Sequence, residues 1–316
     1  MSIAKQGAIA LADEDIDVVR PRGIRIKESG VDRAFLVVVY LLLIVLLAVV
    51  LLPLMYIVAS SFSSPGAVSS GRVSLWPVEF SVRGYQVAFR DPQIVRGFLN
   101  SIFYTFAGTA VSVTLTIAMA FPLSRTNLFG RGVITKLVVF TMLFTGGLIP
   151  TFMIVRSLGM LDTPWALLIP QSIGVWQVLI ASTYFREAIP EELYDAARLD
   201  GAGDISFLFQ IAIPLAKPMI AVIALMYAIQ QWNSYFDALI YLRTDDLYPL
   251  QLVLRNILIL NQASTGQDAA SMVERQQLAD LLKYSLIVIS TAPVLLIYPL
   301  VAKHFTKGIM LGAVKG

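Results

Sequence analysis

The sequence contains no cysteine, a single histidine and few charged residues. Without cysteine the chain cannot form disulfides, iron–sulfur clusters or thiolate metal sites, and one histidine excludes a His-rich metal site. Charged residues make up 14% of the chain and hydrophobic residues 57%, whereas an average soluble domain has about 25% charged residues. We therefore expect an all-α integral membrane protein in contact with lipid, with no metal or other cofactor.

The sequence also lacks a Gly-rich phosphate-binding loop followed by Gly-Lys-Ser or Gly-Lys-Thr. Gly201-Ala202-Gly203 is followed by Asp204, whose charge would repel phosphate. No catalytic constellation is visible, so we expect no enzymatic activity and no ATP hydrolysis by this chain itself. The modest net charge of +3 bears on membrane orientation, and we expect no nucleic-acid partner.

Long apolar runs fill most of the chain. A spanning helix needs about 20 apolar residues. Six candidates follow: residues 34–59, 98–121, 133–155, 165–184, 218–242 and 281–302. The first run is too long, and is preceded by too many acidic residues, for a cleavable signal peptide. We expect it to remain as a membrane anchor in a transport protein of the bacterial cytoplasmic (inner) membrane.

The basic residues predict how these spans are oriented. Fifteen of the 24 Lys and Arg residues fall on the segments that share a side with the N-terminus, and nine fall on the opposite segments. Basic residues are enriched on the cytosolic side, so both termini are predicted to be cytosolic. The predicted organisation is a cytosolic tail at 1–33, a transmembrane domain at 34–316, a cytosolic loop at 186–217, and outer, periplasmic loops at 60–97 and 243–280.

Residues 190–218 form a charged segment in which proline and glycine residues mark the expected ends of short helices. Pro190 followed by Glu191 is typical of a helix start. Gly201 is typical of a helix end, and Asp204 is predicted to cap a second helix. We expect two short helices at an angle. Their small-residue face, which a partner can approach closely, comprises Ala196, Ala197 and Gly201.

This segment resembles the cytoplasmic coupling loop, or EAA loop, of ABC importer permeases. The family pattern is Glu-Ala-Ala, three residues, Gly, nine residues and Ile-x-Leu-Pro. Here it is Asp195-Ala196-Ala197, then Gly201, then Ile211-Ala212-Ile213-Pro214, with every spacing kept. Asp195 stands where the family pattern has Glu. Its side chain carries the same charge but is shorter, so Asp195 is a less certain contact for a partner than Glu would be. The alternative interpretation is an ordinary amphipathic loop between spans.

The resemblance covers the chain from about residue 31 to the C-terminus. Four further stretches look like carbohydrate importer permeases of the lipo-oligosaccharide, multiple-sugar or alginate type: residues 145–150 (TGGLIP), 232–242 (WNSYFDALIYL), 248–251 (YPLQ) and 307–316 (KGIMLGAVKG). It implies the type I ABC importer permease fold. It also implies an assembly of two permeases, two ATP-hydrolysing ATPase subunits and an external solute-binding protein. We expect a heterodimer with a second homologous permease, the homodimer being the alternative.

The same resemblance implies which residues couple the chain to its ATPase. The expected coupling residues are Glu191, Asp195, Ala196, Ala197, Asp200, Gly201, Ala202, Phe207, Ile211 and Pro214. Because this chain offers one such loop, two ATPases require two permeases.

Polar side chains in the fourth and fifth spans are the substrate candidates. Gln230, Asn233 and Asp237 fall on one helical face, with Tyr227 one turn earlier. Such groups are costly in a membrane unless paired or facing a wet cavity, and amides with aromatic rings suit a sugar. The expected substrate path is Gln171, Trp176, Gln177, Tyr227, Gln230, Trp232, Asn233, Tyr235 and Asp237. The alternatives are interhelical hydrogen bonds for the amides and an ion pair of Asp237 with Arg243.

The expected function is an ATP-driven importer of oligosaccharides, acidic ones included. An ion-coupled secondary transporter, an ABC permease for another solute and a membrane scaffold are the alternatives. The coupling segment favours the ATP-driven class, because an ion-coupled carrier needs no such docking surface. The first four spans also hold almost no acids for a proton relay.

Overall fold

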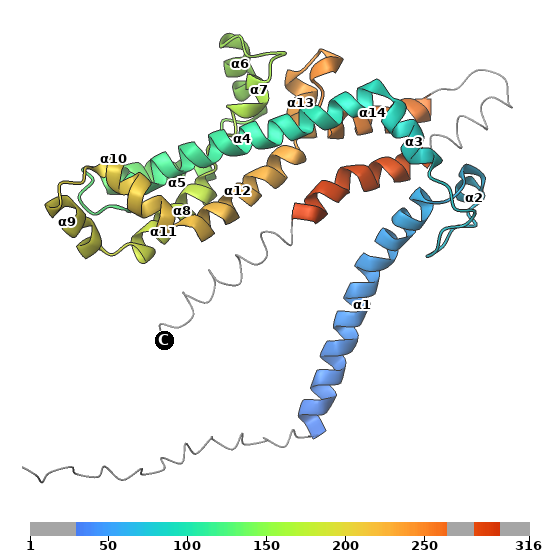
Figure 1. Cartoon of the computed structure of the whole chain (residues 1–316), viewed down its shortest axis with the longest axis horizontal. Helices are drawn as coiled ribbons and strands as arrows, with labels where there is room; N and C mark the ends of the chain where they lie inside the picture. The colour runs from blue at the N-terminus through green and yellow to red at the C-terminus, as the bar shows by residue number, and fades with distance from the viewer. Residues whose placement is uncertain (1–29, 264–280, 298–316) are drawn as a thin grey trace, which may run out of the picture. The chain divides into compact units, whose positions relative to one another are not determined.

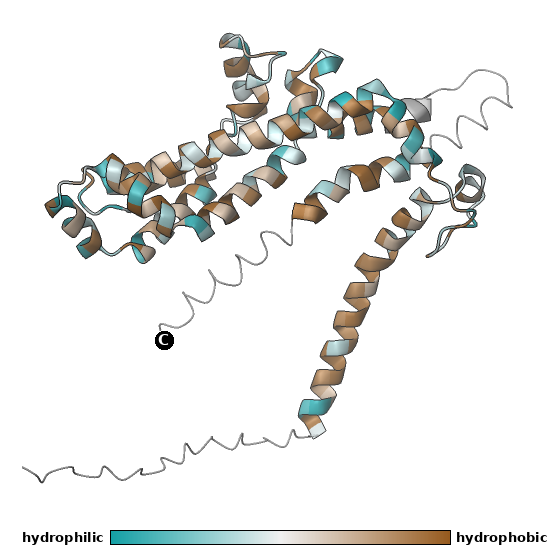
Figure 2. Ribbon diagram, in the orientation of Figure 1, coloured by the Kyte–Doolittle hydropathy of each residue, from teal (hydrophilic) through white to brown (hydrophobic). Residues whose placement is uncertain are grey.

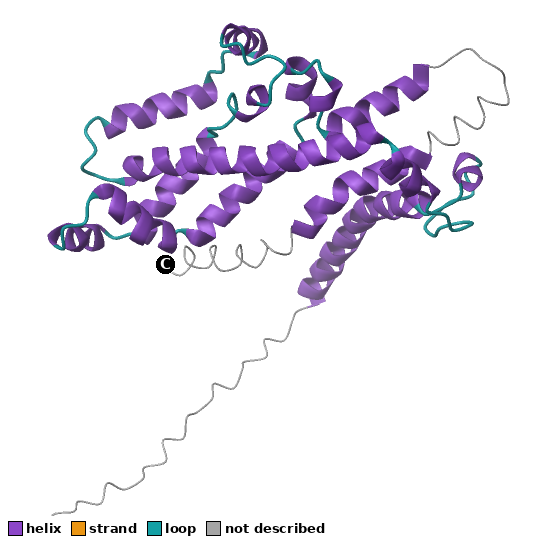
Figure 3. Cartoon of the chain, turned by 45° about the horizontal axis from the view of Figure 1, so that its top comes forward, coloured by secondary structure: helices purple, strands orange, loops and turns teal. Residues whose placement is uncertain are grey.

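The computed structural model describes residues 30–263 and 281–297, and it divides the chain into two compact units, residues 1–51 and 52–316. Every regular element in the described residues is helical, which confirms the all-α prediction (Figure 3). The first unit holds most of helix α1 (Gly30–Ser61), which is apolar almost throughout (Figure 2). The second unit holds the end of α1 and all later helices.

Helix α4 (Pro92–Ser124) is the long central helix of the second unit (Figure 1). Its start is fixed by Pro92 in the first turn and by Asp91, whose carboxylate accepts the backbone N–H of Gln93 at 2.8 Å. It packs against α8 (Val175–Ala188), α12 (Lys217–Trp232) and α14 (Leu250–Ala263). Its buried small residues include Gly97, Ser101, Gly108, Ser112, Thr116 and Ala120. Small side chains allow the close helix approach typical of membrane bundles.

The remaining elements are short. Before α4 lie α2 (Pro65–Ser69) and α3 (Arg83–Arg90). After it come α5 (Arg131–Leu143), α6 (Leu148–Ser157) and α7 (Trp165–Leu168). The chain then continues after α8 through α9 (Glu191–Leu199), α10 (Asp204–Phe207), the π-helical turn η1 (Leu208–Ala212) and α11 (Ile213–Leu215). Beyond α12 lie α13 (Tyr235–Tyr241), the 3-10 turn η2 (Asp245–Leu247) and, after α14, the helix Leu281–Ile297.

Two described helices, α1 and α4, are each long and apolar enough to cross a membrane. Two further pairs qualify only when joined across a bend: α5 with α6 at 111°, and Asp204–Leu215 with α12 at 83°. The described residues therefore contain two such spans, or four when each bent pair counts as one, where the sequence predicted six. The last predicted span is described only as Leu281–Ile297, and its remainder lies outside the described residues.

Three of the predicted spans are interrupted, each for a local reason. The run 133–155 breaks at Gly146-Gly147, where Gly147 has φ of 83°, a conformation that L side chains rarely adopt. The run 165–184 breaks between α7 and α8, at Pro170 to Gly174. The run 218–242 breaks between α12 and α13, at Asn233 and Ser234. Breaks of this kind are tolerated within a membrane protein where the freed backbone faces protein or a cavity.

Asp162 joins two loops of the second unit. Its carboxylate accepts the backbone N–H of Arg243 at 2.8 Å, and the backbone N–H and hydroxyl of Thr244 at 2.9 and 2.6 Å. These bonds, the Thr244 hydroxyl first, lower the pKa of the Asp162 carboxyl below its ordinary value. Asp162 has a left-handed φ of 58°, which a short polar side chain tolerates better than most.

Candidate functional site

The predicted coupling segment folds as α9 and α10 joined by a glycine turn. Gly201 has φ of 85°, and the N–H of Ala202 donates to the carbonyl of Ala197 at 2.9 Å. This left-handed helix end is the one that the sequence predicts. The predicted cap of the second helix is wrong by one residue, because Gly203 is the N-cap and Asp204 begins α10. The Asp204 carboxylate instead accepts a hydrogen bond from the Tyr194 hydroxyl.

The predicted coupling residues divide by exposure. The exposed ones are Glu191, Asp195, Ala196, Asp200, Gly201 and Pro214. Ala202 and Ile211 are half-buried, while Ala197 and Phe207 are buried in the core around α4. Leu199, which was not among the predicted coupling residues, is 90% exposed directly before the glycine turn. Its position at the end of a predicted helix was the signal that could have identified it.

At the end of α4, Arg125 lies among three aromatic rings. Its guanidinium carbon is 4.9 Å from the ring centre of Phe121, 5.3 Å from Tyr194 and 5.6 Å from Phe207. The residue is 7% exposed, and its Nε and one terminal nitrogen, Nη2, have no hydrogen-bond partner. A desolvated cation–π contact stabilises by about 2 kcal/mol, which offsets part of the cost of burying this charge. Burial is also the main cause that lowers the pKa of Arg125.

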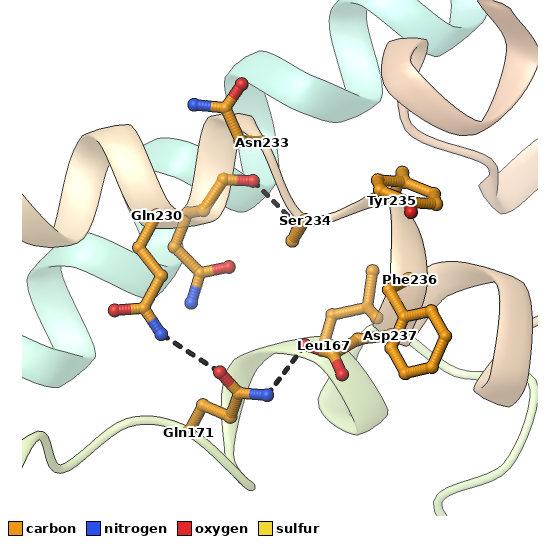
Figure 4. Close-up of a pocket in the computed structure, with 9 residues that line it drawn as sticks. Leu167, Gln171, Gln230, Asn233, Ser234, Tyr235, Phe236 and Asp237 are labelled. Carbon is orange, nitrogen blue, oxygen red and sulfur yellow. Dashed lines mark hydrogen bonds between the residues drawn. The ribbon is translucent and has the colours of Figure 1, made fainter. Parts of the chain in front are cut away.

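A polar pocket lies where α12 gives way to α13 (Figure 4). Its volume is about 250 Å³. Its lining residues are Leu167, Gln171, Gln230, Gln231, Asn233, Ser234, Tyr235, Phe236 and Asp237. The break after α12 brings this group together, because it turns the chain so that both helix ends face the connection between α7 and α8.

Two hydrogen bonds between side chains link the elements that line the pocket. The side-chain amide of Gln230 donates to Gln171 Oε1 at 2.9 Å, and the amide of Gln171 donates to Asp237 Oδ2 at 2.9 Å (Figure 4). Gln171 therefore links the end of α12 to α13. Asp237 accepts a hydrogen bond from Gln171, and the ion pairs found among the described residues do not include one between Asp237 and Arg243. The amide and carboxylate oxygens of these side chains have lone pairs that the two bonds do not use. These lone pairs can accept hydrogen bonds from hydroxyl groups.

Five of the nine predicted path residues line this pocket: Gln171, Gln230, Asn233, Tyr235 and Asp237. Trp176 is 57% exposed on α8 and lines a separate hollow with Glu187. Gln177, half-buried on the same helix, lies beside Gly174. The structure thus brings together the residues around the break and leaves the two from α8 apart.

Tyr227 and Trp232 are packed into the protein core instead. Tyr227 is 1% exposed, and its hydroxyl lies 2.7 Å from Thr116 Oγ1 and accepts the N–H of Gly174 at 2.9 Å. Trp232 is 5% exposed, and its indole N–H donates to the carbonyl of Ser290 at 2.8 Å. Both side chains hold helices together, and neither lines the polar pocket.

Four lining residues were absent from the predicted path: Leu167, Gln231, Ser234 and Phe236. Ser234 and Phe236 border the helix break, so a break predicted at Asn233-Ser234 would have pointed to them. Gln231 is buried against Gly108 of α4. No signal in the sequence marks Leu167.

No protein-family model matches the sequence. The chain is 40% identical over 266 residues to Protein LplC of Bacillus subtilis (strain 168), covering 84% of this chain and 89% of that protein. It is 40% identical over 285 residues to the Polygalacturonan/rhamnogalacturonan transport system permease protein YtcP of the same organism, covering 90% and 99%. It also superimposes on a chain of a bacterial ABC transporter involved in the import of the acidic polysaccharide alginate. That match has a TM-score of 0.82 and 34% identity, and covers 88% of this chain and 99% of that one.

These similarities extend over nearly the whole length of each relative. YtcP is named as a transport system permease protein, and the solved structure is an ABC transporter; a permease is a transport component and not an enzyme. Together with the apolar helices, these similarities make this chain a multi-pass protein of the inner membrane. The chain belongs to the family of ABC transporter permeases.

Proposed function

We propose that this chain is the membrane-spanning permease subunit of an ATP-driven importer of oligosaccharides. The observation that carries the proposal is the pocket at the break between α12 and α13, where side-chain amides, hydroxyls, aromatic rings and one carboxyl group converge. Sugars present hydroxyls at their rims and C–H groups on their faces, which match such a lining. Relatives named for polygalacturonan and alginate transport support a cargo that includes acidic oligosaccharides.

The proposed topology has six spans, counting each interrupted run as one. Residues 1–33 form a cytosolic tail and 34–316 the transmembrane domain, with the coupling loop 186–217 inside and the loops 60–97 and 243–280 in the periplasm. Reporter fusions after residue 70 and near residue 265 should report outside, and fusions near residues 130 and 200 inside. An outside signal at residue 200 would contradict docking of this loop on a cytosolic ATPase.

We propose that the coupling loop docks in a cleft of the partner ATPase. The exposure of Glu191, Asp195, Ala196, Asp200 and Gly201, along α9 and the glycine turn that follows it, supports this. Movement of the ATPases would then drive the pocket between outward-facing and inward-facing states. The hydrogen bonds of Gln171 join elements on both sides of the break, so substrate hydroxyls can replace them when those elements separate.

The proposed assembly contains a second homologous permease, two ATPase subunits and a solute-binding protein on the outer side. Mass measurement of the purified complex tests this stoichiometry. Two identical permease chains with no homologue present would contradict the heterodimer.

Truncation of the pocket amides tests the transport role. In reconstituted complex, Gln230→Ala and Gln171→Ala should each lower sugar-stimulated ATP hydrolysis without changing the amount of ATPase bound. Gln86→Ala is a matched control, because Gln86 is exposed on α3 and does not line the pocket. If both pocket variants transport the cognate sugar normally, these amides serve only helix packing.

A further inference from the structure

We propose that Arg125 is a positioning residue that transmits movement of the coupling helices α9 and α10 to the central helix α4. This inference rests on the proposed docking of the coupling loop on an ATPase. It concerns the step after docking, namely how a displacement at the loop reaches the membrane helices.

The first argument is the origin of the three rings around the guanidinium. Phe121 belongs to α4, Tyr194 to α9 and Phe207 to α10, and all three ring centres lie within 5.6 Å of the guanidinium carbon. The Tyr194 and Phe207 rings also meet edge to face at 5.0 Å. One side chain at the end of α4 therefore contacts both coupling helices at once.

The second argument is that Arg125 has few alternative partners. Its Nε and Nη2 atoms are buried without a hydrogen-bond acceptor, so the electron-rich ring faces are their neighbours. If α9 or α10 moved away while α4 stayed, the guanidinium would lose the ring contacts that its buried nitrogens have in place of hydrogen bonds. Joint movement of the three helices avoids that cost.

Adjacent contacts reinforce the same connection. The hydroxyl of Thr126, the next residue, donates to the carboxylate of Glu191 at the start of α9. The Tyr194 hydroxyl donates to Asp204 at the start of α10. The two coupling helices are thus fastened to each other and to the residues that directly follow α4.

From α4 the connection continues to the polar pocket. Helix α12 packs along α4, and Gln231 at its end lies against Gly108. Gln230 and Gln231 both line the pocket. A packed route therefore runs from the coupling helices through Arg125 and α4 to the proposed sugar site. A route of this kind demonstrates coupling only when variants along it change the coupling.

The test uses the full complex in proteoliposomes with its ATPases and solute-binding protein. The measured quantity is sugar taken up per ATP hydrolysed. Arg125→Lys keeps the charge but removes the planar group that contacts three rings, and Arg125→Met keeps the length and removes the charge. We expect each to lower uptake per ATP at least about fivefold, a typical size for coupling between sites, with the ATPase subunits still bound. Arg33→Lys, an exposed arginine near the start of α1 and outside the coupling loop, is the matched control.

A double-variant experiment separates a positioning role from a general loss of stability. If Arg125 acts through the rings, Arg125→Met should cause little further loss in a Phe207→Leu background, whereas independent roles would give multiplied losses. Unchanged uptake per ATP in Arg125→Lys and Arg125→Met would overturn the assignment. Loss of bound ATPase in both variants would also overturn it, because the role would then be structural.

Gly201→Trp separates the role of Arg125 from the docking proposal on which that role rests. If Gly201→Trp uncouples transport while the Arg125 variants do not, docking stands and only the role of Arg125 fails. If Gly201→Trp leaves coupling intact, the docking proposal itself fails.

Discussion

The indole N–H of Trp232 donates a hydrogen bond to the backbone carbonyl of Ser290, with 2.8 Å between nitrogen and oxygen. This bond ties the end of α12 to the helix Leu281–Ile297. The ring of Phe98 meets the indole edge to face at 5.9 Å and adds α4 to the same contact. Trp232 therefore connects three helices. The residues on either side of it in the sequence line the pocket, but Trp232 itself does not.

Trp232→Phe should lower stability more than it lowers sugar specificity. It removes one buried hydrogen bond and leaves the Ser290 carbonyl without this donor, a loss of about 1–3 kcal/mol. The expected result is a lower Tm of the purified complex, with sugar stimulation per intact complex retained. An unchanged Tm with lost sugar stimulation would instead place the indole in the sugar path.

Gly108 should not tolerate a side chain. A Cβ at this position would come within 2.6 Å of the side-chain Cδ of Gln231, and overpacking of this kind typically costs about 1–3 kcal/mol. Gly108→Ala should therefore lower the Tm and the yield of folded complex. Gly132→Ala on α5 is the control, because its Cβ would meet nothing within 4 Å. Equal effects of the two substitutions would count against close packing of α4 on α12.

Asp162→Ala should lower the Tm by a few degrees. It removes the acceptor of three hydrogen bonds and places alanine at a left-handed φ. Asp162→Asn keeps an acceptor and tolerates this φ, so it should lose less. Tm measured for all three proteins at one pH ranks them, and an order with Asn below Ala would contradict the proposed contacts.

The lowered pKa of Asp162 also fixes the sign of a pH effect. A carboxyl whose pKa is lower in the folded state contributes stability above its unfolded value, about 3.9, and loses it as pH falls through the folded value. The Tm difference between Asp162→Asn and the natural protein should therefore stay constant from about pH 7 to 5 and shrink only at lower pH. A difference that shrinks already between about pH 7 and 5 would show that another group is responsible.

Gly201→Trp should uncouple ATP hydrolysis from transport. The large side chain adds strain at φ of 85° and occupies the exposed turn that the ATPase would approach. Gly201→Asn keeps the left-handed turn without the bulk, so it separates strain from obstruction. Membrane insertion should be normal in both, and full coupling in Gly201→Trp would contradict docking at this turn.

Ala196→Arg is a sharper probe of docking than Ala197→Arg. Ala196 is exposed on α9, whereas Ala197 is 8% exposed and belongs to the core around α4. Arginine at residue 197 would disrupt folding before it affected a partner. Ala196→Arg should reduce the ATPase captured with the complex while leaving the Tm of the permease unchanged, and full capture would argue against contact at this face.

Local signals in the sequence predicted local structure well. The glycine end of α9 follows from residue chemistry alone, because few other residues adopt that φ. The sequence grouped Gln230, Asn233 and Asp237 by helical spacing, and all three do line one pocket, but the break after α12 is what brings them together. The interruptions of the apolar runs were harder to predict, because hydropathy does not distinguish a straight helix from two short ones joined at Asn233-Ser234.

Burial of individual side chains could not be read from the sequence. Tryptophan and tyrosine are residue types that stack on sugars, so the sequence does not distinguish a packed Trp232 or Tyr227 from a sugar-stacking one. In the structure their polar groups form hydrogen bonds with Ser290 and Thr116 instead. Arg125 carries no motif signal at all. Its surroundings exist only because α9 and α10 fold back onto the end of α4.

Uptake of labelled oligosaccharide into proteoliposomes tests the central claim most directly. The vesicles hold the complete complex and are supplied with the solute-binding protein, with ATP inside or absent, and with ion gradients present or collapsed. An ATP-driven permease predicts uptake that requires ATP and the binding protein and that persists when all ion gradients are collapsed. Uptake that proceeds without ATP and stops when the gradients are collapsed would contradict it.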